Sequence, residues 1–441
     1  MSALQKALGK MIRQMTISNE QIELIAENFR NEMLKGLAGN KSSLKMLPSF
    51  IATPTGKETG KFLALDFGGT NIRALLVELL KDGQFIVHEQ CTKSLKDSKG
   101  EYDYLYSKVS GDVLFDFIAD HIASIAEREK AYDMGHTFSF PCEQTEINKA
   151  KLLYWGKEIN IKGVEGFDIN TLLSEALVRR GMPTIKPRAI INDTVGTLLT
   201  AAYGDASADI GSICGTGHNT AYLETNLLGQ QPMIINIESG YFNIIDTTIY
   251  DDELDKASEH PGEQRLEKMI SGCYLGTLLR TIARDLLREG LFVSSSTAAD
   301  KILNKRDSIS SQDVSALISD HSTDLSKIAY WLERDLKIVK SSMEDRMVIK
   351  KIAAVIASRS ARLVAATYLG ILSHIDPLLE RKHTIAIDGS LYEKMPGYHK
   401  EICQAMGEVL QEKESMVTIR LSKNGSGIGA AIAAAIADNQ Q

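Results

Sequence analysis

Apolar residues recur along the chain at two spacings, one typical of helices and one typical of strands. Near the N-terminus the apolar positions are three or four residues apart, which predicts a helix docked on the rest of the protein. These positions are Leu4, Leu8, Met11 and Met15. The run PSFIATPTGKETG, residues 48–60, then predicts a loop because it is rich in proline, glycine and threonine.

Strand patterns begin directly after this loop. Residues 61–80, KFLALDFGGTNIRALLVELL, predict two strands joined by a glycine turn, and residues 84–91 add a third strand after the Asp82-Gly83 turn. The predicted elements that follow are a helix over 113–129, a strand over 137–140, a helix over 171–180 and a strand over 189–191. An antiparallel meander followed by alternating helices and strands indicates a mixed α/β unit.

The second half of the sequence repeats the motif of two strands joined by a glycine turn. Residues 209–225, DIGSICGTGHNTAYLET, predict a hairpin whose turn, residues 215–219, is similar to residues 68–71 of the first half. The remaining predicted elements are a strand near 233–236, a mostly helical stretch over 263–373, strands over 383–387 and 416–421, a helix between those strands and a closing helix. The pattern therefore predicts two α/β units with related turns.

Composition and charge fit an ordinary globular protein. The chain has 441 residues, of which 44% are hydrophobic and 24% charged, enough for two packed domains. Its net charge of -7 and pI near 5.8 lack the basic surface that nucleic-acid binding needs, so we expect no nucleic-acid partner. Because five cysteines are scattered singly, neither a zinc site nor a disulfide framework is predicted.

The sequence favours a soluble, cytoplasmic protein. No stretch approaches the roughly 18 consecutive apolar residues of a membrane helix, and the run 430–437 is far too short, so we expect no membrane partner. Lys6, Lys10 and Arg13 precede the first acid, Glu20, and an organelle-targeting segment is the alternative interpretation of this start. We prefer the docked helix, and the unpaired cysteines fit a reducing compartment.

The two glycine turns carry candidate phosphate-binding chemistry. Asp66 ends a strand, and the glycines after it let backbone N–H groups and the Thr70 hydroxyl approach a phosphate, with Arg73 close behind. A plain hairpin turn explains one such motif equally well. Two turns, the second carrying Thr216, predict instead a clamp for the β- and γ-phosphates of a nucleotide.

A third motif, AIINDTVGTLL, places Asn192 and Asp193 where an apolar strand runs into a helix. An Asp at this position is also a favoured helix N-cap, which is the competing interpretation. An amide beside a carboxylate suits a polyhydroxyl ligand, and Asp193 is then placed to accept a hydroxyl proton.

Three further acids or bases are candidates with ordinary alternatives. Residues 137–159 place Ser139 and Lys157 where they could meet a sugar or the transferring phosphoryl group, although Lys157 alone is more typical of a solvated surface lysine. Glu238 and Glu267 alone are likewise more typical of surface acids than of ligands, and sequence spacing does not bring them to one site. The segments IAIDGSLY and NGSGIGAAIAAA place small residues where an adenosine could lie, or where helices pack closely.

Taken together, the ordered motifs resemble the eukaryotic-type hexokinase and glucokinase family. They are LDFGGTNIR, FSFPCEQ, WGKEI, INDTVGTL, CGTGHN, NIESG, PGEQRLEK, IDGSLY and GSGIGAA, and they span residues 65–431. The resemblance covers nearly the whole chain and corresponds to one family unit without tandem duplication. It implies an α/β, two-domain, actin-like ATPase (ribonuclease H-like) fold with a deep interdomain cleft that closes on sugar.

The resemblance also implies a domain division and site residues. Residues 1–195 would form mainly the small domain and residues 196–441 the large domain, with the last helix returning to the small one. Asp193 is similar to the catalytic base of the family, with Lys157 and Arg73 stabilising the transferring group. The implied sugar-binding residues are Ser139, Phe140, Pro141, Lys157, Asn192, Asp193, Asn219, Asn236, Glu238 and Glu267.

The implied ligands are a hexose, ATP and Mg²⁺. The ATP-binding residues by resemblance are Asp66, Gly68, Gly69, Thr70, Asn71, Arg73, Gly215, Thr216, Gly217, Gly389, Ser390, Gly425 and Gly427. Asp66 would position the Mg²⁺ ion through water, since this ion keeps much of its hydration. The activity implied is transfer of the γ-phosphoryl group of Mg·ATP to the 6-hydroxyl of glucose or a related hexose, the first step of glycolysis.

Two departures from the family pattern bear on sugar specificity. Gly156 stands where the family usually has Thr before the sugar-loop lysine, and Ser239 stands where it commonly has Trp. A catalytically weak sugar-binding regulator on the same body is therefore one alternative, although both phosphate turns, Asp193 and Lys157 are present. Another sugar kinase of this fold is a second alternative. Several such kinases resemble a family with a zinc-binding Cys and His cluster, and the absence of that cluster here disfavours this alternative. A chaperone or filament-forming ATPase would not need FSFP or PGEQRLEK.

Overall fold

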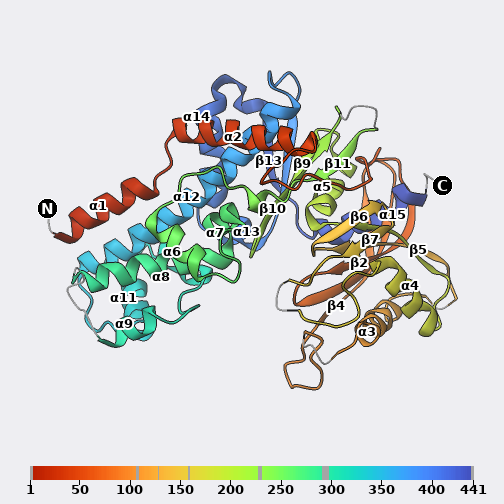
Figure 1. Cartoon of the computed structure of the whole chain (residues 1–441), viewed down its shortest axis with the longest axis horizontal. Helices are drawn as coiled ribbons and strands as arrows, with labels where there is room; N and C mark the ends of the chain where they lie inside the picture. The colour runs from red at the N-terminus through yellow and green to blue at the C-terminus, as the bar shows by residue number, and fades with distance from the viewer. Residues whose placement is uncertain are drawn as a thin grey trace.

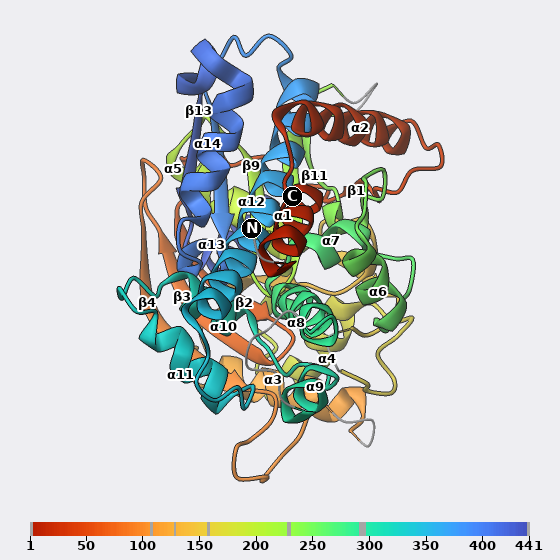
Figure 2. The ribbon, with the colours of Figure 1, turned by 90° about the vertical axis from the view of Figure 1, so that its left-hand side faces the viewer.

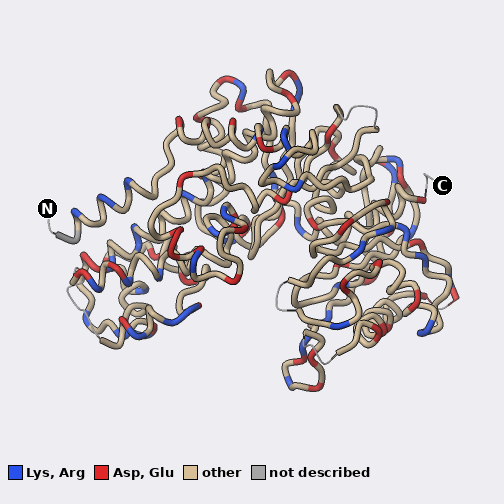
Figure 3. The backbone as a smooth tube through the Cα atoms, in the orientation of Figure 1, with Lys and Arg blue, Asp and Glu red and all other residues tan. Residues whose placement is uncertain are grey.

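The computed structural model describes residues 3–105, 109–127, 129–156, 159–226, 231–290 and 297–438. These residues form two large β-sheets with helices packed against them, and a helical region beside the second sheet (Figure 1). The two ends of the chain lie at opposite ends of the molecule in this view (Figure 1). Acidic and basic residues are interspersed over both parts (Figure 3), so neither sign of charge dominates this view.

The first sheet has five strands in the order β4, β3, β2, β5, β8. Their bounds are β2 Gly60–Phe67, β3 Asn71–Leu79, β4 Phe85–Ser94, β5 Tyr132–Phe138 and β8 Ile185–Ile191. The first three pair antiparallel, which confirms the predicted meander, and β5 and β8 add parallel neighbours. Along β2, Leu63 and Leu65 share a core with α3 (Gly111–Ala123) and α4 (Ile169–Arg179), whereas Phe62 and Ala64 belong to a different core because side chains alternate across a strand.

The second sheet has six strands in the order β1, β11, β10, β9, β12, β13. Their bounds are β1 Leu47–Pro48, β9 Ala208–Cys214, β10 His218–Glu224, β11 Met233–Asn236, β12 His383–Asp388 and β13 Val417–Leu421. The β9–β10 hairpin confirms the second predicted glycine turn. β9, β12 and β13 are parallel, so the turns after β9 and β12 lie at the same edge of this sheet.

Two helices lie between the sheets. α5 (Asp193–Gly204) packs on β9 and β10, α15 (Gly425–Asp438) packs on β2, β5 and β8, and the two helices pack on each other. Every residue of α15 from Gly425 to Ala437 is buried, and most are glycine or alanine, which allows the close approach. The chain therefore returns at its last described helix to the first sheet.

The helical region surrounds one long helix, α12 (Met343–Ile375). The other members are η1 Ser239–Tyr241, α6 Ile249–Ala257, α7 Arg265–Ile270, α8 Gly272–Arg288, α9 Thr297–Leu303, α10 Ser311–Ile318, α11 Ser326–Arg334, α13 Ser390–Lys394, α14 Tyr398–Leu410 and η2 Gln411–Met416. α12 contacts α2, α8, α10 and α14 (Figure 2). It is long and apolar enough to span a membrane, but 78% of its most apolar window is buried inside the protein, which is typical of a core helix.

The N-terminal helix docks on the body as predicted. α1 (Ala3–Met15) contacts α12 and buries Met11 and Met15, and α2 (Asn19–Leu37) follows it. Two other predictions were less accurate. The helix predicted over 113–129 ends at Ala123. The hairpin of β6 (Cys142–Glu146) and β7 (Lys149–Leu152) was not predicted, since its strands have only five and four residues and β6 is mostly polar.

Candidate functional site

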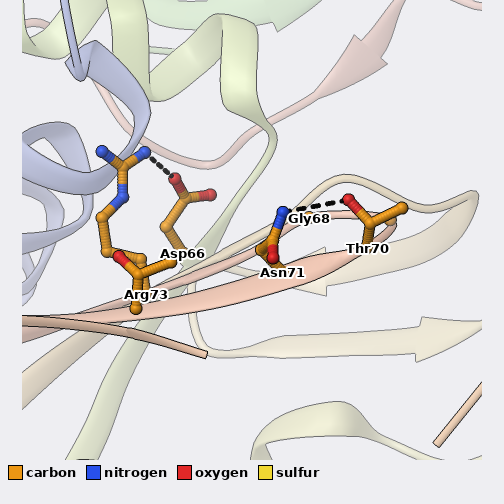
Figure 4. A pocket seen from close by; sticks show the side chains of 7 residues that line it. Asp66, Gly68, Thr70, Asn71 and Arg73 are labelled. Atoms are coloured by element: carbon orange, nitrogen blue, oxygen red, sulfur yellow. Dashed lines mark hydrogen bonds and ion pairs between the residues drawn. The ribbon is translucent and has the colours of Figure 1, made fainter. Parts of the chain in front are cut away.

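The first glycine turn joins β2 to β3 and lines a pocket. The Gly68 N–H group donates to the Asn71 carbonyl at 3.0 Å and closes the turn, and Asn71 Nδ2 donates to Thr70 Oγ1 at 3.1 Å (Figure 4). The pocket has a volume of about 310 Å³ and is lined by Asp66, Gly68, Gly69, Thr70, Asn71, Arg73 and Thr92. All six residues predicted here from the first turn therefore border one cavity.

Arg73 is turned toward Asp66 in this pocket (Figure 4). Its Nη2 lies 2.7 Å from Asp66 Oδ2, and its Nη1 donates to Asn424 Oδ1 at 2.5 Å. Ser426 Oγ also donates to Asp66 Oδ2 at 2.9 Å. The carboxylate and the guanidinium predicted to serve phosphate chemistry are thus held together, and both are tied to the start of α15.

The second glycine turn, Gly215 to Gly217, is held by α8. The Gly215 N–H group donates to the Gly217 carbonyl, while Gly272 N–H and Cys273 N–H donate to the Gly215 and Thr216 carbonyls at 2.9 and 3.0 Å. The Thr216 side chain is exposed, as is that of Thr70 in the first turn. Each turn therefore presents one hydroxyl to solvent.

The segment after β12 lies directly against this second turn. Gly389 has a φ of 126°, and a Cβ atom there would lie 2.3 Å from the Cys214 carbonyl oxygen, so only glycine fits. Asp388 accepts from Gly389 N–H at 2.7 Å and from Gly425 N–H at 3.2 Å. One carboxylate thus links Gly389 and Ser390 to the Gly425 turn.

Asp388 was not among the residues predicted for the site. Burial raises its pKa, the Asp66 carboxylate acts in the same direction, and Arg73 opposes both. Asp66 and Asp388 therefore lie near enough to interact, at the edges of two different sheets. The sequence signal that could have identified Asp388 is its position directly before Gly389. Asn424 and Ser426 were also missed, because only their hydrogen bonds to Arg73 and Asp66 in the folded protein identify them.

The start of α5 carries Asn192 and Asp193. Asn192 is the N-cap: its Oδ1 accepts from Thr194 N–H at 3.0 Å and from Thr194 Oγ1 at 2.7 Å. Asp193 is the first helical residue, is half-buried, and accepts from Thr194 N–H at 2.9 Å. The capping role considered for Asp193 belongs to Asn192.

Asn192 also belongs to a cluster of amides and a carboxylate. Asn219 Nδ2 donates to Asn236 Oδ1 at 2.8 Å and to Glu238 Oε1 at 3.3 Å, and lies 3.5 Å from Asn192 Oδ1. Asn236 Nδ2 donates to Glu238 Oε1 at 2.9 Å. Four predicted sugar residues from α5, β10, β11 and the turn after β11 are therefore contiguous.

Glu267 joins this cluster to the second turn. Its Oε2 accepts from His218 N–H at 3.3 Å, and a Cβ atom on Gly240 would lie 3.0 Å from the same oxygen. Glu238 and Glu267 thus flank Gly240, although they are far apart in sequence. Ser239, which replaces the usual family Trp, is fully buried and donates to Thr220 Oγ1 at 3.3 Å.

The buried Cys214 and His218 flank the second turn without forming a charged pair. Cys214 Sγ lies 3.5 Å from His218 Nδ1. Burial raises the pKa of Cys214 to about 11 and lowers the pKa of His218 to about 4, so thiol and imidazole are both neutral near pH 7. This pair is therefore not an activated cysteine nucleophile.

The segment after β5 contributes an aromatic cluster. Phe140 is buried, and its ring centroid lies 5.1 Å from Trp155 and 5.4 Å from Phe67. Ser139 and Pro141 are half-buried on either side of it. Phe140 thus packs this loop, while Lys157 lies outside the described residues.

The residues of the first pocket fit a hydrated Mg²⁺ ion. Within the described ranges, no group of three or more His, Cys, Asp or Glu residues is arranged to hold a metal ion. Asp66 of this pocket and Asp388 nearby supply carboxylate oxygens beside the two glycine turns, and Mg²⁺ commonly uses one or two carboxylates plus substrate phosphates and water. This donor set suits Mg²⁺ bound together with a nucleotide.

Comparison with known proteins gives consistent results. Two sequence models of the hexokinase family match residues 7–203 and 209–436. The chain is 34% identical to Hexokinase-1 of Schizosaccharomyces pombe, over 98% of this chain and 91% of that protein, and 35% identical to Hexokinase-7 of Oryza sativa subsp. japonica, over 98% and 97%. The solved hexokinase from Schistosoma mansoni complexed with glucose has a TM-score of 0.84, is 32% identical, and covers 98% of this chain and 100% of that one.

Proposed function

This chain belongs to the hexokinase family, and we propose that it transfers the γ-phosphoryl group of Mg·ATP to the 6-hydroxyl of glucose or a related hexose. The expected α/β, two-domain, actin-like fold is confirmed by the solved relatives. The observation that carries the assignment of the site is the contiguous cluster of Asn192, Asn219, Asn236 and Glu238 next to Asp193.

The cluster suits a hexose because amide and carboxylate groups pair with vicinal hydroxyls. Glu238 and Glu267 offer acceptors on the two sides of Gly240. We assign Ser139, Pro141 and Lys157 to the opposite side of the sugar, since Ser139 and Pro141 directly follow β5 of the first sheet. A hexose held between the two sheet units would be oriented for transfer.

ATP would bind where the two turns and the two glycine segments converge. Thr70, Thr216 and the turn N–H groups are assigned to the β- and γ-phosphates. Gly389, Ser390, Gly425 and Gly427 border the second turn and the pocket, and are assigned to the adenosine. Small residues here let the base and ribose approach the backbone.

In the proposed reaction, Asp193 accepts the proton of the sugar 6-hydroxyl as the bond from O6 to the γ-phosphorus forms. The bond from that phosphorus to the bridging oxygen breaks, and ADP leaves with the electron pair. Arg73 and Lys157 neutralise the transferring group. Asp66, acting through water, would hold Mg²⁺ together with the ATP phosphates, with Asp388 nearby, and the ion would supply further positive charge.

Exclusion of water completes the proposed mechanism. We assign residues 1–195, after the N-terminal segment, mainly to a small domain and residues 196–441 to a large domain. The exceptions are α1 and α2, which pack on α12, β1, which pairs with β11, and α15, which packs back on the first sheet. Closure of the two domains on sugar would prevent transfer of the phosphoryl group to water. Because all five cysteines are free, a reducing compartment such as the cytoplasm is the proposed location.

An ADP-release assay over glucose, fructose, mannose, galactose and N-acetylglucosamine tests this function. Turnover with at least one hexose is expected, and Asp193→Ala should lower kcat by about 10²- to 10⁴-fold while sugar binding weakens less. Asp112→Ala is the matched control, since Asp112 is an exposed acid in the first turn of α3. Glucose binding by calorimetry without any turnover would favour the regulator, and near-normal kcat in Asp193→Ala would remove Asp193 from the role of base.

A further inference from the structure

Two tyrosine hydroxyls join the loop after β7 to the turn after Glu238. Tyr154 Oη lies 3.4 Å from Tyr241 Oη. Tyr154 belongs to residues 153–156, which come directly before Lys157, and Tyr241 ends η1, three residues after Glu238. The contact therefore links the two segments that carry proposed sugar residues from opposite sides.

The two tyrosines belong to different halves of the molecule. Next to Tyr154, the Trp155 ring packs against Phe67 of β2 and Phe138 of β5, in the first sheet unit. Tyr241 follows β11 and packs with β10 and α7, in the second sheet unit. A bond between their hydroxyls is thus a bond between the two units at the proposed sugar site.

The ring of Tyr241 also contacts a lysine side chain. Lys45 Nζ lies 4.5 Å from the centroid of the Tyr241 ring, and the Lys45 N–H group donates to the Ile237 carbonyl at 3.0 Å. Burial raises the pKa of Tyr241, and the bond to Tyr154 and the Glu238 carboxylate act in the same direction. Tyr241 is therefore a neutral hydroxyl at physiological pH, able to donate as well as accept.

Tyr154 is the more adjustable partner. It is 48% exposed, whereas Trp155 beside it is fixed by a 2.9 Å bond from Nε1 to the Ile161 carbonyl and a 2.8 Å bond from its N–H group to Glu165 Oε1. Among the described residues, apart from its chain neighbours, no atom lies within 4 Å of where a Cβ atom on Gly156 would be. The loop thus has open space at Gly156 and a contact to the second unit at Tyr154.

We propose that Tyr154 and Tyr241 are positioning residues that hold residues 153–156 beside the turn after Glu238 and thereby set the affinity for the hexose. This inference rests on the proposed function for its kinetic consequence. If the contact orders the loop before the sugar binds, the loop loses less conformational entropy on binding. Loss of the contact should therefore weaken sugar binding. Neither hydroxyl takes part in phosphoryl transfer, so kcat is preserved.

Steady-state kinetics of Tyr154→Phe, Tyr241→Phe and the double variant test the positioning role. Each single variant should raise KM for glucose about three- to tenfold with kcat unchanged, the usual effect of one hydrogen bond. The double variant should be no worse than the weaker single variant, because both changes remove the same bond. Tyr330→Phe, at an exposed tyrosine on α11, is the control and should leave KM unchanged. Unchanged KM in both single variants, effects that multiply in the double variant, or an equal fall in kcat would each overturn the proposal.

A second measurement does not depend on activity. Trp331 is 6% exposed and bonded to Asp313, so acrylamide quenching of the ligand-free protein reports mainly on Trp155. Quenching should increase in Tyr154→Phe and Tyr241→Phe and stay constant in Tyr330→Phe; constant quenching in all three would overturn the tether. If quenching increases while the wild-type protein phosphorylates no hexose, the proposed function fails and the tether between the two units stands.

Discussion

Gly429 on α15 and Gly196 on α5 pack backbone against backbone, so closely that a Cβ atom on Gly429 would lie 2.1 Å from the Gly196 carbonyl oxygen. The two helices fill the space between the sheets, and α5 begins with Asn192 as its cap and Asp193 as its first residue. The spacing of the two sheets, and with it the distance between the proposed sugar and phosphate residues, is therefore set by two glycines.

We predict that Gly429→Ala destabilises the protein by more than about 2 kcal/mol, because the neighbouring atom is backbone and cannot rotate away. Thermal unfolding followed by calorimetry measures the change. Gly9→Ala is the matched control: this helical glycine has only the Arg13 side chain near its Cβ position, at 3.7 Å, so alanine should be neutral or stabilising. Equal melting temperatures for wild type and Gly429→Ala would contradict the close packing of α5 and α15.

Gly156→Thr should lower KM for glucose. The described part of the chain, apart from the residues bonded to Gly156, has no atom within 4 Å of a Cβ there, and a restored hydroxyl contact is worth about 0.5–1.5 kcal/mol. Gly156→Ala separates the hydroxyl from the loss of backbone freedom and should give little of the gain. If KM for Gly156→Thr is unchanged or higher, the loop makes its sugar contact in another way.

Trp155 should report domain closure. In a Trp331→Phe background, glucose alone should change the Trp155 emission, because closure would move the indole into a drier setting, while galactose should do much less. Trp331 lies on α11, away from the sugar loop, so its replacement leaves the reporter intact. A flat titration with glucose binding established by calorimetry would rule out a closing loop.

Glu32 should make stability depend on pH. Burial raises its pKa, but hydrogen bonds from Lys35, Ser43 and Ser42 outweigh burial and lower the pKa to about 2. Its folded pKa is thus below its unfolded value of 4.5, so its contribution is complete above pH 4.5 and is lost as the pH falls toward 2.

Replacing this carboxylate by an amide tests the prediction. Glu32→Gln should lower the free energy of unfolding by about 1–3 kcal/mol at pH 7 and by little near pH 2. Glu27→Gln, at an exposed acid on the same helix, should change neither value. A stability difference that does not depend on pH would show that the Glu32 charge is not the stabilising feature.

The sequence patterns predicted most strands and helices because their apolar periodicities are strong and local. Residues 233–236 match β11, and the two glycine turns lie where expected. The β6–β7 hairpin was missed because both strands are short: β6 is mostly polar and has no buried residue, and β7 alternates exposed and buried residues over only four positions. The end of α3 was misplaced because Ile125 and Ala126 continue the apolar period past its C-cap, Ser124.

Most of the proposed site residues could be predicted from the sequence, but which of them contact one another could be learned only from the fold. Asn192 and Asp193 were predicted from a strand that runs into a helix. No spacing rule relates Glu238 to Glu267 across Gly240, or Arg73 to Asn424, since these pairs come together only through the packing of α7 and α15. No sequence motif around Tyr241 indicated a role for it, because its proposed role depends on contact with Tyr154 in the other sheet unit.

The return of α15 to the first sheet has a consequence for biosynthesis. Strands β2, β5 and β8 leave the ribosome long before residues 425–438, so the face that carries Phe62, Ala64 and Ala189 lacks its α15 cover on the nascent chain until those residues have been synthesised. Exposed apolar strand surface of this kind favours aggregation and chaperone binding. The unit that is synthesised first is thus the last to complete its core.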